Sequence, residues 1–343
     1  MQDHYDLAVG RPLNVSLLAG SKAHHAYYDR AASSASELTA DQFAAGFPPR
    51  PSLNLHLFGG KTIADLVFVN HYLGGPAAWD PADIASIDAA LAKAMSDSGL
   101  QSVMQQYYDP IISSRMLASA VLPDPAPATV YKDQVEALAA RIYGGGGLGD
   151  ADPASTLINV MLPRGVILVD GFSPGFTPPA GQEAEHERRQ RAVVNVDDDQ
   201  DADSRRGLGG YHGSTHVTSG GAEVAIYYAV GVYSAGSNGI PAFDQPWKNV
   251  VATFYHELNE ARTDPDVEDA IRTNDSAKLG WYSAKGGEIG DIPVKEAATR
   301  LALVFQEVEL ADGSGTVPVQ LMWSNKDDAP ATHIAEPSAT HVA

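Results

Sequence analysis

The chain has 343 residues, of which 44% are hydrophobic, so it is long enough for one large globular domain with extensions. The 43 acidic and 23 basic residues give a formal net charge of -20, which argues against nucleic acid or an anionic membrane surface as a partner. The sequence has no cysteine, which excludes disulfides, thiolate metal ligands and a cysteine nucleophile. Any metal must therefore be bound by His, Asp or Glu.

Residues 1–51 are expected to form an N-terminal extension, because their hydrophobic pattern is weak and they end in a proline-rich joint at 47–51. One interpretation is a pro-segment that inhibits the domain that follows. Residues 1–20 lack a basic start followed by a sustained apolar run, so we expect no signal peptide. No other segment is apolar enough to predict a membrane span.

Residues 52–329 are expected to form the main domain, with an exposed insertion near 174–206 and a flexible tail over 330–343. The insertion carries alternating aspartates, but Ala202 stands where a calcium-binding EF-hand loop needs glycine, which favours a solvated acidic loop. Hydrophobic periodicity predicts the regular elements of the main domain. The predicted strands are 53–58, 63–72, 157–162, 165–169 and 223–233, of which 157–162 and 165–169 belong to a central sheet, and 301–308 and 317–323 are expected to complete the sheet-like material. The predicted helices are 80–95, 133–143 and 247–266.

The stretch GGYHGSTH, at 209–216, offers two histidines, His212 and His216. A metal-ligand pair is one interpretation, and a turn with one structural histidine is the other. If the stretch is a strand, both side chains lie on the same face.

The helix predicted at 247–266 carries the strongest chemical motif, with Asp244 as its expected cap. Within HELNE, the four-residue step from His256 to Glu260 places an imidazole and a carboxylate one turn apart, with Glu257 beside them. This is the spacing of the HExxH zinc helix, with Glu260 in place of the second histidine. Zinc accepts carboxylate oxygens, so the pattern predicts a metal site with Glu257 as general base, and its alternative is a solvated helix face.

A catalytic zinc needs a third protein ligand, and two downstream sources are open. Glu288 lies in the glycine-rich GGEIGD segment, where the backbone can approach closely. Asp266 has the offset of the third ligand in HExxHxxGxxH, but Thr263 stands where that pattern has its turn-making glycine. Glu288 is therefore preferred to Asp266. Asp264 and Asp291 are then expected to orient the ligands, to contact the substrate or to cap helix ends.

The chain resembles the bacterial and fungal relatives of the EXORDIUM, or phosphate-induced, protein family in three stretches, TFYHELNEARTDPDV, GWYSAKGGEIGDI and VQLMWSNKDDA. Upstream, VFVNHYLGGPAAWDPADIASIDAAL is similar to the family's early strand and helix, and GGYHGSTH to its CGYH stretch, so that the resemblance spans about 53–329. The family is mostly secreted and usually carries cysteines, whereas Gly209 and Gly210 precede Tyr211 here.

Members that keep the HExxE helix resemble zincin metallopeptidases, which implies an α+β fold with a mixed twisted sheet, an active-site helix and an irregular C-terminal subdomain. It also implies one Zn²⁺, or another divalent ion, held by His256, Glu260 and Glu288, and a metal-bound water that Glu257 deprotonates to attack a peptide bond. The strand 223–233 is expected to offer its free edge to an extended peptide substrate. His212 is expected to be structural or to polarise the substrate, because YH persists in relatives without the zinc helix.

The plant relatives imply an alternative function, a non-catalytic extracellular or cell-surface binding protein. Glu257 favours the metallopeptidase over the binding protein, because a binding protein needs no carboxylate beside the two helical ligands. A purely structural metal site or a salt-bridged helix end is a third reading, although structural zinc sites usually use Cys and His.

Overall fold

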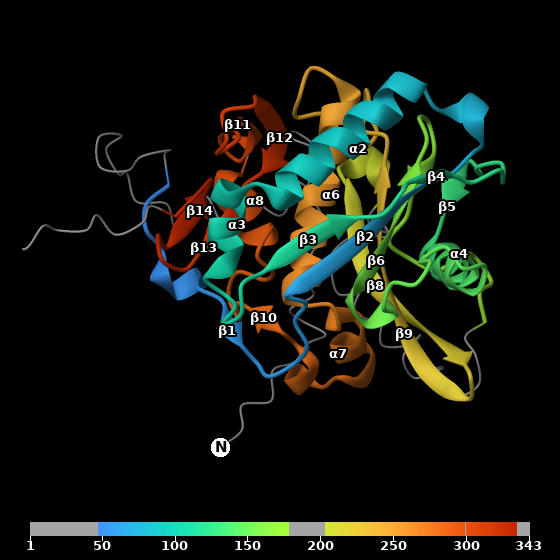
Figure 1. Ribbon diagram of the computed structural model, residues 1–343, viewed down its shortest axis with the longest axis horizontal. Coiled ribbons are helices and arrows are strands. Elements are labelled where there is room, and N and C mark those ends of the chain that lie inside the picture. The colour runs from blue at the N-terminus through green and yellow to red at the C-terminus, as the bar shows by residue number, and fades with distance from the viewer. Residues whose placement is uncertain (1–46, 178–202, 299, 335–343) are drawn as a thin grey trace, which may run out of the picture.

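The structure, a computed structural model, describes residues 47–177, 203–298 and 300–334. Its centre is a mixed sheet in the order β3-β2-β6-β9-β8, with β4 also pairing with β2 (Figure 1). All neighbouring strands run parallel except β8, which lies antiparallel to β9 at one edge. The strands are β2 (Asp65–Tyr72), β3 (Ser113–Met116), β4 (Ala120–Val121), β6 (Thr156–Leu162), β8 (Gly210–Ser219) and β9 (Ala222–Val232). The expected α+β composition with a mixed sheet is confirmed.

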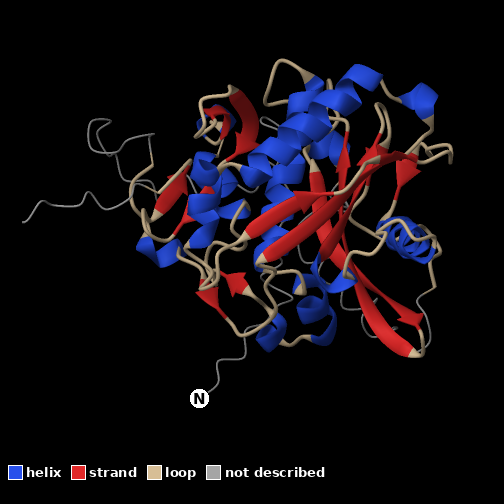
Figure 2. Ribbon diagram, viewed as in Figure 1, coloured by secondary structure: helices blue, strands red, loops and turns tan. Residues whose placement is uncertain are grey.

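Helices cover both faces of this sheet, as Figure 2 shows. They are α2 (Pro81–Ser96), α3 (Ser98–Gln105), α4 (Lys132–Gly144), α6 (Pro246–Thr263), α7 (Val267–Thr273) and α8 (Asp291–Ala297). Strand β6 is buried throughout, and its alternating side chains enter two different cores. Leu157 packs with α2 and α6, whereas Ile158 packs with α4.

Helix α6 is enclosed on all sides by the sheet, α2 and β12 (Thr316–Gln320). The expected apolar face is buried, but so is every other residue from Asn249 to Thr263. The motif side chains are therefore buried, which excludes the solvated-face interpretation. The expected cap at Asp244 is wrong: Gln245 is the N-cap, and Asp244 contacts Lys248 instead.

The remaining strands form small antiparallel or parallel pairs outside the central sheet. They are β1 (His56–Leu57) with β10 (Trp281–Tyr282), β5 (Thr129–Val130) with β7 (Ile167–Leu168), β11 (Phe305–Glu309) with β12, and β13 (Met322–Ser324) with β14 (Ala329–Ala331). The assignment of 165–169 to the central sheet was wrong. Only four residues separate β6 from β7, too few for the crossover that a parallel neighbour requires.

Most of the predicted N-terminal extension, insertion and C-terminal tail lies outside the described residues. The segments concerned are 1–46, 178–202 and 335–343. Packed structure begins at Phe47 and resumes at Asp203, and both side chains are buried. The first residues of the predicted tail are ordered, because β14 pairs with β13.

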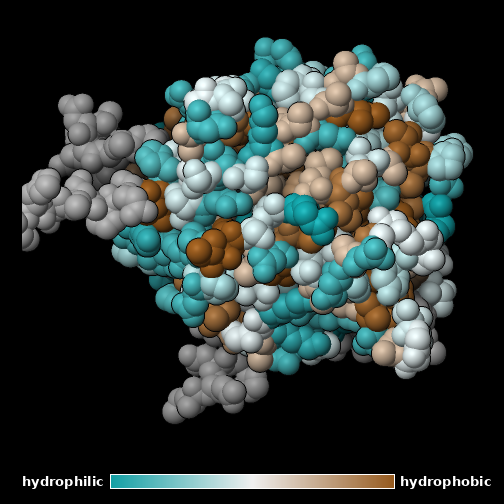
Figure 3. Space-filling view, viewed as in Figure 1, coloured by the Kyte–Doolittle hydropathy of each residue, from teal (hydrophilic) through white to brown (hydrophobic). Residues whose placement is uncertain are grey.

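The surface of the described part is mixed in character. Figure 3 shows hydrophobic residues in separate patches among hydrophilic ones on the face in view. Leu57 and Ile111 are the large hydrophobic residues recorded as exposed within the described ranges. Among the helices of those ranges, none is long and apolar enough to cross a membrane.

His71 of β2 makes the fold sensitive to acid. Its side chain is buried, and neither ring nitrogen has a hydrogen-bond partner among the described residues. Burial lowers the pKa of His71 from 6.5 to about 4. The unfolded chain therefore binds the proton first, and stability falls as the pH drops from about 6.5 to about 4, by up to ~3 kcal/mol.

Replacing the histidine tests this expectation. Urea unfolding of wild type and His71→Leu at several pH values between 7 and 4 should show a smaller acid loss in the variant. His333→Leu, at an exposed histidine, serves as the matched control. An acid loss of equal size in wild type and His71→Leu would contradict the assignment.

Candidate metal centre

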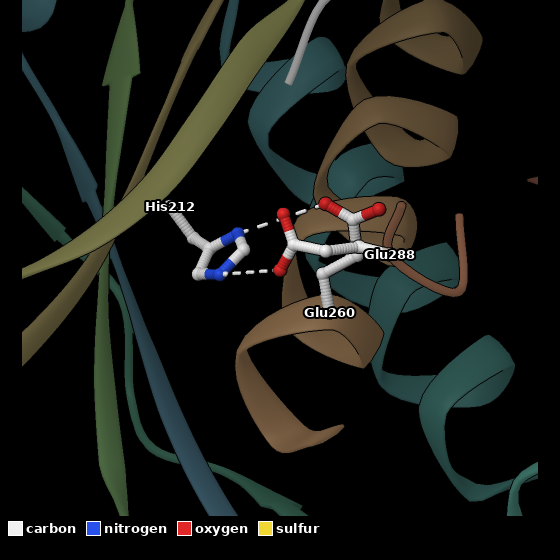
Figure 4. A group of neighbouring side chains, drawn as sticks. All are labelled: His212, Glu260 and Glu288. Carbon is white, nitrogen blue, oxygen red and sulfur yellow. Dashed lines mark ion pairs between the residues drawn. The ribbon is translucent and has the colours of Figure 1, made fainter. Parts of the chain in front are cut away.

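Strand β8, helix α6 and the segment before α8 meet at one buried cluster. His212 projects from β8 toward α6, and Figure 4 shows its imidazole facing the carboxylates of Glu260 and Glu288. Glu288 comes from the glycine-rich stretch between β10 and α8. His212, Glu260 and Glu288 are all 0% exposed. The cluster depends on the edge strand, because β8 packs against α6 and carries His212.

These three residues form the first group that could hold a metal ion, with ligand atoms all within 4.8 Å of one another. His212 Nε2 lies 3.4 Å from Glu288 Oε1, and His212 Nδ1 lies 3.7 Å from Glu260 Oε2. His212 Nε2, Glu260 Oε2 and both oxygens of Glu288 have no hydrogen-bond partner among the described residues. Unpaired polar atoms are costly to bury, and a bound cation would satisfy all four at once. The residues present therefore fit a divalent metal ion.

A second group consists of His256, Glu260 and Asp291, again with ligand atoms within 4.8 Å of one another. His256 Nε2 lies 3.0 Å from Glu260 Oε2. The sequence motif had combined His256 and Glu260 with Glu288. In the structure Glu260 belongs to both groups, Glu288 joins it beside His212, and His256 joins it beside Asp291.

Gln320 of β12 fixes the orientation of His256. Its Oε1 accepts a hydrogen bond from His256 Nδ1 at 2.7 Å, and its Nε2 donates to the carbonyl of Gly290 at 2.6 Å. An amide oxygen only accepts, so Nδ1 carries a proton, and Nε2 is the ring nitrogen that faces Glu260. A Cβ at position 290 would lie 2.5 Å from His256 Nδ1, so this close approach requires glycine.

Glu260 is held by the backbone at the start of α8. The amides of Gly290 and Asp291 donate to its Oε1 at 3.1 and 3.0 Å. This leaves Oε2 facing both imidazoles. The hydrogen bonds make the GGEIGD segment a support for the helical carboxylate as well as the source of Glu288.

Burial and the density of carboxylates perturb every titrating group of the cluster. Burial and then Glu260 raise the pKa of Glu288 well above its usual value, and burial raises the pKa of Asp264 to about 8 and that of Asp291 to about 7. Burial alone would lower the pKa of His256, but Glu260 and Glu257 outweigh it and raise the pKa to about 10. The cluster thus retains protons that a bound cation would displace.

Glu257 lies between the two imidazoles. Its Oε2 is 3.4 Å from His212 Nδ1, and its Oε1 is 3.9 Å from His256 Nε2. Glu257 and His256 are each 2% exposed, whereas Glu260 and Glu288 are 0% exposed. All four side chains are therefore buried. Burial raises the pKa of Glu257, which suits a group that takes up a proton.

The two aspartates after α6 have different surroundings. Asp264 Oδ1 accepts from the amide of Gly280 at 2.9 Å, and its buried Oδ2 has no partner among the described residues. Asp266 instead accepts from the hydroxyl of Tyr227 at 2.8 Å and belongs to neither ligand group. His216 also lies apart, with its Nε2 3.2 Å from Asp269 Oδ2.

The free sheet edge is not where the sequence analysis placed it. The strand predicted at 223–233 is β9, which pairs with β6 on one side and β8 on the other, so the prediction that it offers an edge to a peptide was wrong. Gly220 and Gly221, with φ of 59° and 83°, form a tight turn that folds β8 back along β9. Among the described residues, β8 pairs only with β9, so its outer edge is the free one.

Gln320 was not predicted as a site residue, and His212 was predicted to be structural or to polarise the substrate rather than to bind the metal. The signal for Gln320 was a single amide inside the apolar stretch VPVQLMW, since a buried glutamine needs partners. Comparison with protein-family models, with curated proteins and with solved structures finds no match to this chain.

Proposed function

We propose that the chain is a zincin-like metallopeptidase that hydrolyses peptide bonds at the buried His/Glu cluster. The observation that carries the proposal is that four buried atoms of this ligand group have no hydrogen-bond partner among the described residues: His212 Nε2, Glu260 Oε2 and both oxygens of Glu288. A ligand bound by these atoms would remove the free-energy cost of burying four polar atoms without partners.

His212, Glu260 and Glu288 would hold the ion. Imidazole nitrogen and carboxylate oxygen are accepted zinc ligands, and the carboxylate-rich set also suits a harder divalent ion. When bound, the ion would act as a Lewis acid toward water and the scissile carbonyl. His256 lies next to this group, and Gln320 holds its Nδ1 so that Nε2 faces Glu260.

Glu257 is the proposed general base. It takes a proton from the attacking water as the water oxygen bonds to the carbonyl carbon. It then passes the proton to the amine nitrogen as the carbon–nitrogen bond breaks. Its position between His212 and His256 and its raised pKa fit this exchange.

The outer edge of β8 is the proposed substrate platform. A peptide that adds to this edge as a further strand would run beside His212 and above α6. The edge of β8 thus replaces the strand 223–233 as the proposed binding site for an extended peptide.

A non-catalytic metal-binding function is the second candidate. The observation that favours it is the depth of the cluster, because its side chains are at most 2% exposed. A deeply enclosed metal would stabilise the fold without meeting substrate. The two candidate functions differ in whether the chain hydrolyses peptides in a reaction that depends on Glu257.

The experiment measures metal content and peptide hydrolysis together. The full chain, purified without a histidine tag and dialysed against zinc, should retain zinc by elemental analysis and cleave a quenched-fluorescence peptide library. Glu288→Gln should weaken zinc binding by at least about 10- to 100-fold. Glu309→Gln, which alters an exposed carboxylate of β11, should change neither. A chain that remains metal-free after dialysis would contradict the proposal, and bound zinc without hydrolysis would favour the second candidate.

A further inference from the structure

We propose that the cluster binds two divalent metal ions rather than one, with Glu260 bridging them. The first ion is the one on which the proposed function rests, at His212, Glu260 and Glu288. The second lies at His256, Glu260 and Asp291.

The arrangement of ligand atoms favours two positions. Each group separately brings three ligand atoms within 4.8 Å of one another, and the two groups share Glu260 alone. Glu260 Oε2 lies 3.0 Å from His256 Nε2 and 3.7 Å from His212 Nδ1, so it stands between the two imidazoles. Carboxylates in this position bridge paired metals 3.5–4 Å apart in many hydrolytic enzymes.

The fixed orientation of the ligands supports the same conclusion. Two backbone amides hold Glu260 Oε1, which leaves Oε2 as the oxygen for metals. Gln320 holds Nδ1 of His256, which leaves Nε2 as the ligand nitrogen. His256 is thus prepared for an ion in the way that metal-binding histidines usually are, although it does not belong to the first group.

The second group offers ligands that one ion would not use. An ion in the first group would be held by His212, Glu260 and Glu288. The second group would still present the Nε2 of His256 and a carboxylate of Asp291.

The test counts metals on the full chain. After dialysis against zinc, elemental analysis should find two ions per wild-type chain and one per Asp291→Asn chain, because asparagine keeps the size and the backbone amide but is a poor ligand. Glu309→Gln should keep two. With Mn²⁺ in place of zinc, electron paramagnetic resonance should show spin-coupled ions in wild type and isolated ions in Asp291→Asn.

Lys295→Met separates loss of a ligand from loss of an ion pair. It removes the partner of Asp291 but leaves the carboxylate, so two ions should remain. Loss of the second ion from Lys295→Met would overturn the assignment of Asp291 as a ligand. One ion in both wild type and Asp291→Asn would overturn the two-ion inference and leave the proposed function standing. No bound ion in wild type would overturn both.

Discussion

Glu257→Gln should lower the rate of peptide hydrolysis by about 10²- to 10⁴-fold, the usual contribution of a general base. Glutamine has nearly the same shape and cannot take up the proton. Glu257 belongs to neither ligand group, so the bound metal should stay at its wild-type level. The loss should appear in kcat more than in KM, because the proton transfer occurs only in the transition state.

The measurement combines steady-state hydrolysis of a cleaved peptide with elemental analysis of the same samples. Glu309→Gln provides the control for removing a carboxylate without touching the cluster. If Glu257→Gln hydrolysed the peptide at the wild-type rate, Glu257 would not be the base. If the variant lost its metal instead, the carboxylate would be a ligand.

Lys132→Met should destabilise the fold by about 3–5 kcal/mol. Lys132 begins α4, and its Nζ contacts Glu268 Oε1 of α7 and lies 3.6 Å from Asp170 Oδ1. The side chains of Lys132 and Glu268 are 6% and 7% exposed, so the substitution would leave the Glu268 carboxylate buried without its ammonium partner. Lys132 Nζ also lies 5.3 Å from the centre of the Tyr211 ring, next to His212.

Denaturant unfolding measures this effect, and a double variant identifies its cause. Lys132→Met/Glu268→Gln removes both charges and should recover a large part of the lost stability. Lys248→Met is the matched control, because its more exposed ion pair with Glu307 should cost less than about 1 kcal/mol. A loss as small for Lys132→Met as for Lys248→Met would contradict the assigned burial of the pair.

The helical motif was predictable because its information is local. His256, Glu257 and Glu260 lie within five residues, so helical periodicity alone places their side chains together. The same holds for α2 and β6, whose apolar patterns predicted their positions within a residue or two. Glu288 was reachable because glycines around a single carboxylate are an unusual local composition.

The place of His212 could not be predicted locally. Its meeting with Glu260 and Glu288 depends on which strand lies at the sheet edge, and the strand formed by 223–233 was taken for that edge. The strand pairing depends on contacts far apart in the sequence, since β6 inserts beside β9 and leaves β8 outside. A strand's own residues do not specify its neighbours.

The sequence by itself determined a cysteine-free, strongly acidic, mixed α/β chain with a helix that carries an imidazole and two carboxylates. These properties follow from composition and from periodicity over a few turns. The tertiary structure alone decided that α6 is enclosed on every side, that His212 joins the cluster, that Gln320 orients His256, and that Glu260 is shared between two ligand groups. Each of these depends on packing between segments tens of residues apart, where burial and charge compensation, rather than local propensity, select the arrangement.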